Sequence, residues 1–245
     1  LQVSQAFEKK RKKSKNLAID KIMLDGFKSL ENKDFKIENG EIIMEHARSI
    51  KSAEEIKAMR CSISACETSI HVMEKETKPG MTENDIWSIL HSENIKRGGE
   101  WIETRLLSSG TKTNPWFQEC GSRILQNNEI VAFDTDLVGC YSICTDISRT
   151  WWIGDQEPTK EMKQDYQIAL EHIQKNAELV APGVHFKDLT FKGHQLDDMY
   201  KKQQYSCRFH GVGLCDEFPL ITYPEDYEDC LLYTSPSPRD GLLSR

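Results

Sequence analysis

The stretch FDTDLVGCYSICTDISRTWW, residues 133–152, places three aspartates among apolar and β-favouring residues. A carboxylate in a strand interior is costly unless another group compensates its charge. Residues two positions apart on a strand point to the same face, so Asp134 and Asp136 project together. A turn near Gly139 and a return strand can bring Asp146 opposite this pair. The stretch therefore predicts a β-hairpin that gathers three carboxylates on one face.

A divalent metal ion is the group that best explains such a cluster. Carboxylates at this spacing raise one another's pKa and destabilise the sheet unless a cation neutralises them. His210 in the segment HGVG adds an imidazole, which favours Mn, Fe, Co or Zn over Mg or Ca. Spacing alone is equally compatible with solvent-facing aspartates and a histidine satisfied by its neighbours. The residues therefore give a hypothesis, a metal site with the ligands Asp134, Asp136, Asp146 and His210.

The composition narrows the class of protein. A chain of 245 residues with 38% apolar and 29% charged residues can bury a full core. Its net charge of −7 gives no general attraction to nucleic acid or to an anionic membrane, and the basic run at 9–13 is a local exception. No apolar run is long enough to span a bilayer and no signal-peptide core is visible. We expect a soluble, cytoplasmic protein that binds neither nucleic acid nor membrane.

The eight cysteines are scattered and include no CxxC pair, which favours reduced thiols over disulfides. Cys140 and Cys144 form a CxxxC whose spacing fits no standard zinc site, so we expect free thiols there too.

Three segments are expected along the chain. Residues 1–45 read as the end of an N-terminal domain and a linker, with a helix and then a short hairpin that turns at Asn39 and Gly40. Residues 46–230 form the main domain. In the tail 231–245 periodicity vanishes, and CLLYTSPSPRD resembles a translated library adapter, so we expect this tail to be non-native. The chain also begins at Leu1 without a Met, which suggests a missing or processed start.

Helices alternate with antiparallel strands in the main domain. A capping box at Ser52–Glu55 starts a long helix that stops at Pro79, and Thr82 caps a second helix that ends at Gly98 and Gly99. Further helices are expected at about 159–180 and 186–203, and strands at 101–110, 130–138, 141–153 and 205–215. This order predicts an α+β domain whose sheet is covered by helices.

The order D-x-D, a later D followed by xSRT, and HGVG resembles the metal-binding pattern of the pita-bread superfamily, which includes methionine aminopeptidases, Xaa-Pro dipeptidases and creatinases. The segment KSAEEIKAMR at 51–60 is similar to the first catalytic-domain helix of that superfamily. The resemblance implies a pita-bread fold and a dinuclear metal site that two downstream glutamates complete. This sequence ends before those glutamates can be assigned, so we expect a C-terminally truncated, inactive fragment with a remnant of an N-terminal domain.

Within the superfamily the chain resembles the DddP-type dimethylsulfoniopropionate (DMSP) lyases over residues 46–228, in the segments at 103–123, 131–152 and 210–219. The peptidases use two further histidines, and neither 108–119 nor 214–219 contains one. The resemblance implies a carbon–sulfur lyase that forms dimethyl sulfide and acrylate, two divalent ions of the iron type (Mn, Co or Zn being alternatives), and a homodimer.

Elimination requires a base for the proton α to the substrate carboxylate, while metal ions bind that carboxylate. Asp216 matches the position of the family's base, and Glu217 is the alternative. The sulfonium end of the substrate is a cation that aromatic faces attract. Tyr205 matches the family's substrate-facing tyrosine and Trp116 is a candidate beside it, whereas Trp151 and Trp152 are expected to be packing residues.

Two other functions stay open at this point. One is a hydrolase of the same fold, either a metallopeptidase related to Xaa-Pro dipeptidases and aminopeptidases or a creatinase-like C–N hydrolase, and the absent histidines count against the peptidases. The other is a catalytically inactive binding module, against which the retained set of acidic and imidazole residues counts.

Overall fold

The computed structural model describes residues 15–227. The chain divides into two compact units, Leu1–Ser49 and Ile50–Arg245, each of which is described by itself. The basic run at 9–13, the proposed adapter tail and Cys230 lie outside the described residues.

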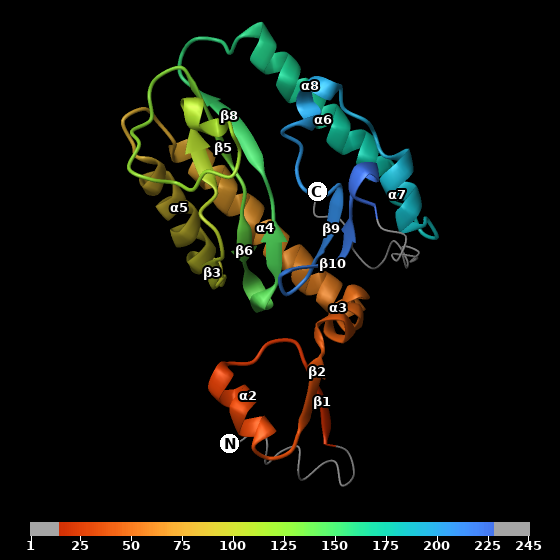
Figure 1. Cartoon of the computed structure of the whole chain (residues 1–245). Coiled ribbons are helices and arrows are strands. Elements are labelled where there is room, and N and C mark those ends of the chain that lie inside the picture. Colours follow the sequence, from red (N-terminus) through yellow and green to blue (C-terminus); the bar gives the residue numbers. More distant parts are fainter. Residues whose placement is uncertain (1–14, 228–245) are drawn as a thin grey trace. The chain divides into compact units, whose positions relative to one another are not determined.

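The first unit is a small βαβ arrangement followed by a helix. Strand β1 (Asn16–Ile19) and strand β2 (Lys36–Asn39) pair in parallel, joined by helix α2 (Leu24–Glu31) (Figure 1). The predicted hairpin at Asn39 and Gly40 is wrong, because the chain continues into helix α3 (Glu41–Ser49). The Asn39 side chain accepts a hydrogen bond from the Glu41 backbone N–H (2.8 Å), and a Cβ on Gly40 would come within 2.7 Å of the Ile19 backbone nitrogen. Close approach to β1, and not a hairpin turn, requires this glycine.

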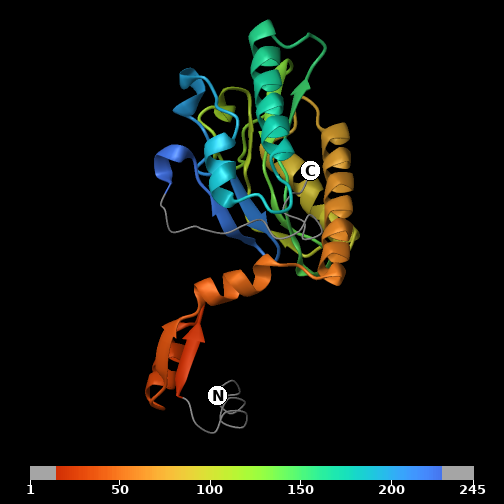
Figure 2. The same ribbon diagram turned by 90° about the vertical axis from the view of Figure 1, so that its right-hand side faces the viewer.

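Two capped helices open the second unit. Helix α4 (Ala53–Glu76) begins with the predicted capping box, in which Ser52 accepts from the Glu55 N–H and Glu55 accepts from the Ser52 N–H. Helix α5 (Glu83–Lys96) begins with an equivalent box between Thr82 and Asp85. Both starts are confirmed, because a capping box depends only on residues three positions apart. The two helices cover one face of the antiparallel strands (Figures 1 and 2).

The strands are shorter and more divided than expected. One sheet has the order β3-β6-β7 and another the order β4-β5-β8, and all pairs are antiparallel. Their bounds are β3 Trp101–Ile102, β4 Leu107–Ser109, β5 Glu129–Phe133, β6 Asp136–Val138, β7 Cys144–Asp146 and β8 Arg149–Ile153. Each of the three predicted strands at 101–110, 130–138 and 141–153 is therefore split between two sheets. The break at 134–135 follows from tertiary bonds: Asp134 N–H donates to the Leu106 carbonyl and Ile147 N–H to the Thr135 carbonyl.

The last part of the unit supplies a long helix and a hairpin. Helix α6 (Lys160–Glu178) starts at Thr159, whose side chain accepts from the Met162 N–H. The helix expected at 186–203 is instead two short helices, α7 (Phe186–Lys192) and α8 (Asp198–Lys201), with Gly193 ending the first. Strands β9 (Phe209–Val212) and β10 (Asp216–Ile221) pair antiparallel with a register shift between Glu217 and Leu220. Short 3-10 turns lie at Gly110–Thr113, Cys140–Ser142 and Pro224–Asp226.

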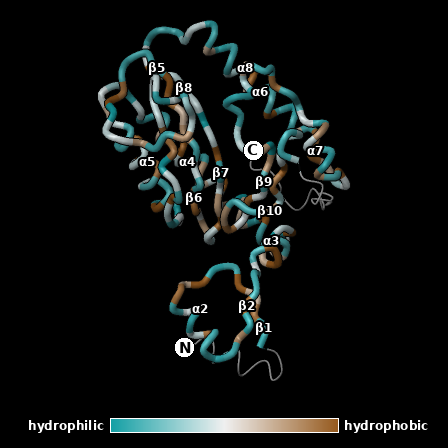
Figure 3. Tube along the Cα trace, in the orientation of Figure 1, coloured by the Kyte–Doolittle hydropathy of each residue, from teal (hydrophilic) through white to brown (hydrophobic). Residues whose placement is uncertain are grey.

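The main core lies between α4, α5 and the two three-stranded sheets. Its members are apolar side chains that are almost fully buried: Cys66, Ile70, Met73, Ile86, Trp87, Leu90, Ile102, Leu107, Cys120, Leu125, Val131, Phe133, Leu137, Ile147 and Ile153. Figure 3 shows the contrast between the hydrophobic β5 and the largely hydrophilic α6. No helix within residues 15–227 is both long and apolar enough to cross a membrane. Burial of this cluster is the main stabilising term for the unit.

Glu83 ties the loop after β4 to the start of α5. Its side chain is completely buried, and its carboxylate accepts hydrogen bonds from Ser109 N–H (3.0 Å), Ser109 Oγ (2.8 Å) and Gly121 N–H (3.1 Å). Lys112 Nζ lies 2.6 Å from Oε2 of Glu83, the oxygen that also accepts from Gly121 N–H. These partners satisfy the hydrogen-bonding capacity of the buried carboxylate. Without the carboxylate, the same partners would be buried with no acceptor, which is costly.

We therefore expect Glu83→Ala to lower the free energy of unfolding by about 3–5 kcal/mol, because it leaves Lys112 and the loop amides unpaired. Urea denaturation followed by circular dichroism measures this value. Glu76→Ala, at an exposed position at the end of α4, is the control and should change stability by less than about 0.5 kcal/mol. A Glu83→Ala effect as small as that of the control would contradict the assignment.

Candidate metal centre and its cleft

Two of the aspartates face each other directly. Asp136 on β6 is the register partner of Asp146 on β7, so the predicted return of Asp146 opposite the first aspartates is confirmed for Asp136. Like charges directly opposite each other destabilise a strand pair. Protons or a cation that reduce this repulsion therefore stabilise the hairpin.

Asp134 lies beside this pair, in the link between β5 and β6. Its Oδ1 accepts hydrogen bonds from Ser148 Oγ (2.7 Å) and from the Thr135 N–H (3.1 Å). Burial, followed by the negative charge of Asp146, raises the pKa of Asp134 to about 7. Burial also raises the pKa of Asp136, and the Asp146 charge adds to that effect. Asp146 is thus close enough to raise the pKa of both Asp134 and Asp136, although the three aspartates do not lie on one continuous strand.

The β9–β10 hairpin brings a histidine and a fourth aspartate to the same place. His210 Nε2 lies 3.0 Å from Asp146 Oδ2, and His210 Nδ1 lies 3.9 Å from Asp216 Oδ1. One ligand-type atom from each of Asp146, His210 and Asp216 lies within 4.8 Å of the other two. Asp216, which was expected as a base, therefore stands among the residues that could ligate a metal.

Electrostatics in this group match the requirements of a cation site. The hydrogen bond to Asp146 raises the pKa of His210 to about 9, and partial burial with the Asp146 charge raises the pKa of Asp216 to about 7. The polypeptide alone thus keeps extra protons among its carboxylates. A divalent ion can replace those protons, because it neutralises several carboxylates at once.

A cleft of about 640 Å³ opens on this group. Its walls include Trp116, Asp134, Asp146, Tyr205 and His210, five of the seven predicted site residues. The other two, Asp136 and Asp216, are not among its lining residues; Asp136 pairs with Asp146, and Asp216 lies beside His210.

The aromatic residues meet at one side of the cleft. The ring of Phe117 stacks on that of Tyr205 with centroids 5.4 Å apart, and Trp116 lies 6.3 Å from Phe117. Burial, followed by the charges of Cys207 and Asp146, raises the pKa of Tyr205 to about 12, so its ring is neutral. Sequence reasoning missed Phe117, although it is adjacent to Trp116 in the NPWF segment.

Glu217 is not available as a base. Its side chain is fully buried and its Oε1 lies 2.5 Å from Nζ of Lys51, which is itself 5% exposed. Alternation along β10 places Glu217 on the opposite face from Asp216. The alternative base considered from the sequence is therefore wrong, because the carboxylate is committed to a buried ion pair at the start of α4.

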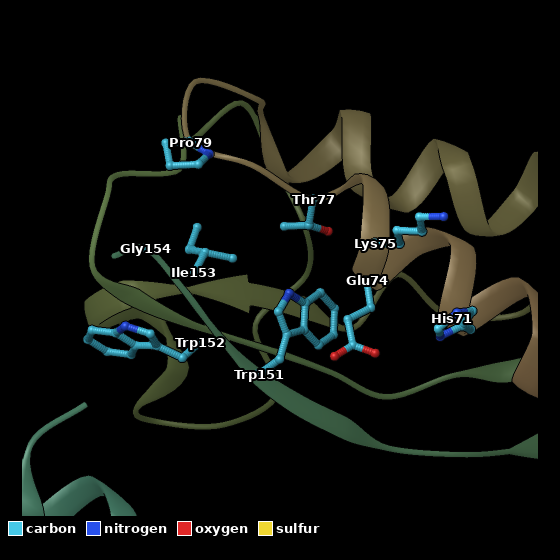
Figure 4. A pocket seen from close by; sticks show the side chains of 9 residues that line it. All are labelled: His71, Glu74, Lys75, Thr77, Pro79, Trp151, Trp152, Ile153 and Gly154. Carbon is cyan, nitrogen blue, oxygen red and sulfur yellow. The ribbon is translucent and has the colours of Figure 1, made fainter. Parts of the chain in front are cut away.

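Trp151 and the described cysteines are as the sequence predicts, and a second cavity lies apart from the predicted site residues. Trp151 packs on the core, where its ring and that of Phe133 form a T-shaped pair with centroids 5.7 Å apart. Seven cysteines lie within the described residues and all are free thiols, including Cys140 and Cys144. A second cavity, of about 400 Å³, lies between the end of α4 and β8. Figure 4 shows the side chains that line it. This second cavity contains none of the predicted site residues, so the cleft beside Asp146 and His210 is the candidate site.

Comparison with known proteins supports this reading. The sequence profile of metallopeptidase family M24 matches residues 57–232. The chain is 56% identical over 214 residues to the dimethylsulfoniopropionate lyase DddP of Roseovarius nubinhibens and 55% identical over 216 residues to that of Roseobacter denitrificans. These matches cover 85% and 86% of this chain but 48% of each relative, so the chain spans about half the length of the curated relatives it matches.

Solved structures of the same architecture share the fold at lower identity. The X-Pro aminopeptidase of Thermotoga maritima has a TM-score of 0.74 at 21% identity, covering 91% of this chain and 64% of that one. The prolidase of Pyrococcus furiosus has a TM-score of 0.75 at 18% identity, covering 94% and 67%. The predicted pita-bread fold is confirmed by this likeness.

The raised pKa of Asp134 leads to a prediction for the metal-free chain. A carboxyl whose pKa is higher in the folded than in the unfolded state loses stability as pH rises from about 4 to 7. Asp134→Asn keeps an acceptor for Ser148 but removes the charge, so it should raise the melting temperature by several degrees at pH 7.5 and by much less near pH 4.5. Differential scanning calorimetry in the presence of a chelator measures both values.

The same variant tests the metal site. Added Mn²⁺ should raise the melting temperature of the unmodified chain, and Asp134→Asn should lose most of that shift. The exposed Asp226→Asn serves as the control and should keep it. Loss of stability at pH 7.5 without metal, together with an unchanged Mn²⁺ shift, would exclude Asp134 from the site.

Proposed function

This chain belongs to metallopeptidase family M24, and from that premise we propose that its protein is a metal-dependent carbon–sulfur lyase that cleaves dimethylsulfoniopropionate to dimethyl sulfide and acrylate. The observation that carries the proposal is the identity of 55–56% to two dimethylsulfoniopropionate lyases across 85–86% of this chain. The absence of histidine from 108–119 and 214–219, where peptidases of this fold are expected to have one, supports it.

Proteins of this family use divalent metal ions, and the residues present fit such a group. Asp134, Asp136, Asp146 and His210 would hold the metal, since they combine hard carboxylate oxygens with one imidazole. When bound, the ions would supply Lewis-acid stabilisation of negative charge that develops on the substrate carboxylate.

Asp216 is the proposed base. It takes the proton from the carbon next to the substrate carboxylate, and the electron pair of that C–H bond becomes the C=C bond of acrylate. The bond from the next carbon to sulfur breaks, and its electrons leave on neutral dimethyl sulfide. The Asp216 side chain is 43% exposed, and its Oδ1 lies 3.9 Å from Nδ1 of His210, which lines the cleft; a substrate bound against His210 would therefore lie next to this carboxylate.

The aromatic side of the cleft is the proposed place of the sulfonium group. Tyr205 and Trp116 line this side of the cleft, and the ring of Phe117 stacks on that of Tyr205 and lies next to Trp116. Such faces attract a methylated cation without requiring a counter-charge.

Three finer proposals rest on the resemblance to DddP-type lyases. They are iron as the metal, a homodimeric assembly and a cytoplasmic location. Manganese, cobalt and zinc suit the same donor set. Elemental analysis after purification and light scattering test the first two.

A metallopeptidase is the second candidate, because the chain is also 28% identical over 182 residues to uncharacterized peptidases of Staphylococcus aureus. Hydrolysis of Xaa-Pro dipeptides by the metal-loaded protein, without release of dimethyl sulfide, would favour it.

The first experiment measures headspace dimethyl sulfide from the complete gene product loaded with Fe²⁺ or Mn²⁺. Asp216→Ala should lower kcat by at least about 10³-fold because elimination loses its base. Metal content should stay near that of the unmodified protein, and the exposed Asp226→Ala should keep full activity. A fully active, metal-loaded Asp216→Ala protein would exclude Asp216 as the base.

The sulfonium site is tested by two variants at one position. Tyr205→Ala should raise KM for dimethylsulfoniopropionate roughly tenfold because it removes a ring face, whereas Tyr205→Phe should change KM less than threefold. Steady-state kinetics give both values. Equal effects of the two substitutions would point to the hydroxyl and not to the ring.

A further inference from the structure

Arg208 is a buried cation immediately before β9. The residue is 9% exposed, and its Nη1 donates to the His194 carbonyl (2.6 Å) and to Asn176 Oδ1 (3.3 Å). The guanidinium also lies over the ring of Tyr223, 4.8 Å from its centroid. One edge of the guanidinium is thus fixed by the protein.

The fold makes room for this side chain. A Cβ on Gly193 would come within 2.3 Å of Arg208 Nη1 and 2.5 Å of Cζ, so only glycine fits there without displacement. The loop between α7 and α8 therefore approaches the guanidinium closely and holds it in place.

The other edge has no partner in the part of the chain that the structure describes. Across residues 15–227, Nε and Nη2 of Arg208 are buried without a hydrogen-bond acceptor, and no carboxylate forms an ion pair with the side chain. Burial of unpaired donors on a cation is costly, and more so than for a neutral group. Nε and Nη2 form the side of the guanidinium that matches the two oxygens of a carboxylate.

The side chain that carries this edge lines the candidate cleft, while Nε and Nη2 themselves are buried. Arg208 lines the same cavity as Asp146, Tyr205 and His210. Arg208 and His210 are two residues apart, so on an extended chain their side chains leave the same face about 7 Å from each other. The cleft thus has an acidic side, formed by Asp134 and Asp146, and a cationic side, formed by Arg208 two residues before His210.

We propose that Arg208 binds the carboxylate of the substrate through Nε and Nη2. The carboxylate would satisfy both unpaired donors, and reaching them requires a small displacement of a lining side chain. A carboxylate has several acceptor positions, so contact with Arg208 leaves others free for a metal ion. With its cationic end at Tyr205 and Trp116, the substrate would be held at both ends. The choice of dimethylsulfoniopropionate as the ligand rests on the proposed function, while the carboxylate site itself does not.

The experiment compares Arg208→Met, which removes the charge and the donors, with Arg208→Lys, which keeps only the charge. In the complete, metal-loaded protein, Arg208→Met should raise KM for dimethylsulfoniopropionate about 10- to 100-fold and weaken inhibition by acrylate by a similar factor. Arg208→Lys should recover part of both, because lysine cannot form the two-donor contact. Lys175→Met removes a nearby charge that does not line the cleft and should change neither value.

Calorimetric titration with propionate separates this inference from the proposed lyase activity. If the unmodified protein releases no dimethyl sulfide, the function is wrong, but propionate binding that Arg208→Met abolishes still supports the site. Unchanged KM, acrylate inhibition and propionate binding in a folded Arg208→Met or Arg208→Lys protein would overturn it. In that case the guanidinium serves only to brace His194 and Asn176, or pairs with a side chain elsewhere in the complete protein.

Discussion

The repulsion between Asp136 and Asp146, placed opposite each other on β6 and β7, is the constraint on which the site depends. A strand pair normally places neutral or opposite charges at such positions. Here Asp134, His210 and Asp216 converge on the same pair, and the elevated pKa values of Asp134 and Asp216 reflect the cost. The charge cluster therefore destabilises the sheet in the absence of a cation. Clusters of this kind are common at functional sites.

Opposite charges are separated along the cleft. Asp134 and Asp146 occupy one part and Arg208 another, and Trp116 and Tyr205 supply aromatic walls, with Phe117 stacked on Tyr205. The proposed substrate, a zwitterion with a carboxylate and a methylated cation, would find a compatible surface for each end.

Two other buried carboxylates support the site from outside it. Glu83 holds the segment 109–121, which carries Trp116 and Phe117, against the start of α5. Glu217 pairs with Lys51 and fastens β10, and with it Asp216, to the start of α4. Each carboxylate contacts residues far from it in the sequence. These contacts fix the positions of loops and strands, which local sequence propensity does not determine.

The sequence by itself determined the features that act over a few residues: the capping boxes of α4 and α5, the i, i+2 relation of Asp134 and Asp136, and the motif that marks the family. Tertiary structure decided the rest. It divided the expected strands between two sheets, made β1 and β2 parallel and paired Glu217 with Lys51. Within residues 15–227 it also left one edge of the Arg208 guanidinium without a hydrogen-bond partner. Caps and alternation depend on neighbouring backbone groups, whereas register, ion pairing and burial depend on which distant segments pack together, and no local pattern encodes that choice.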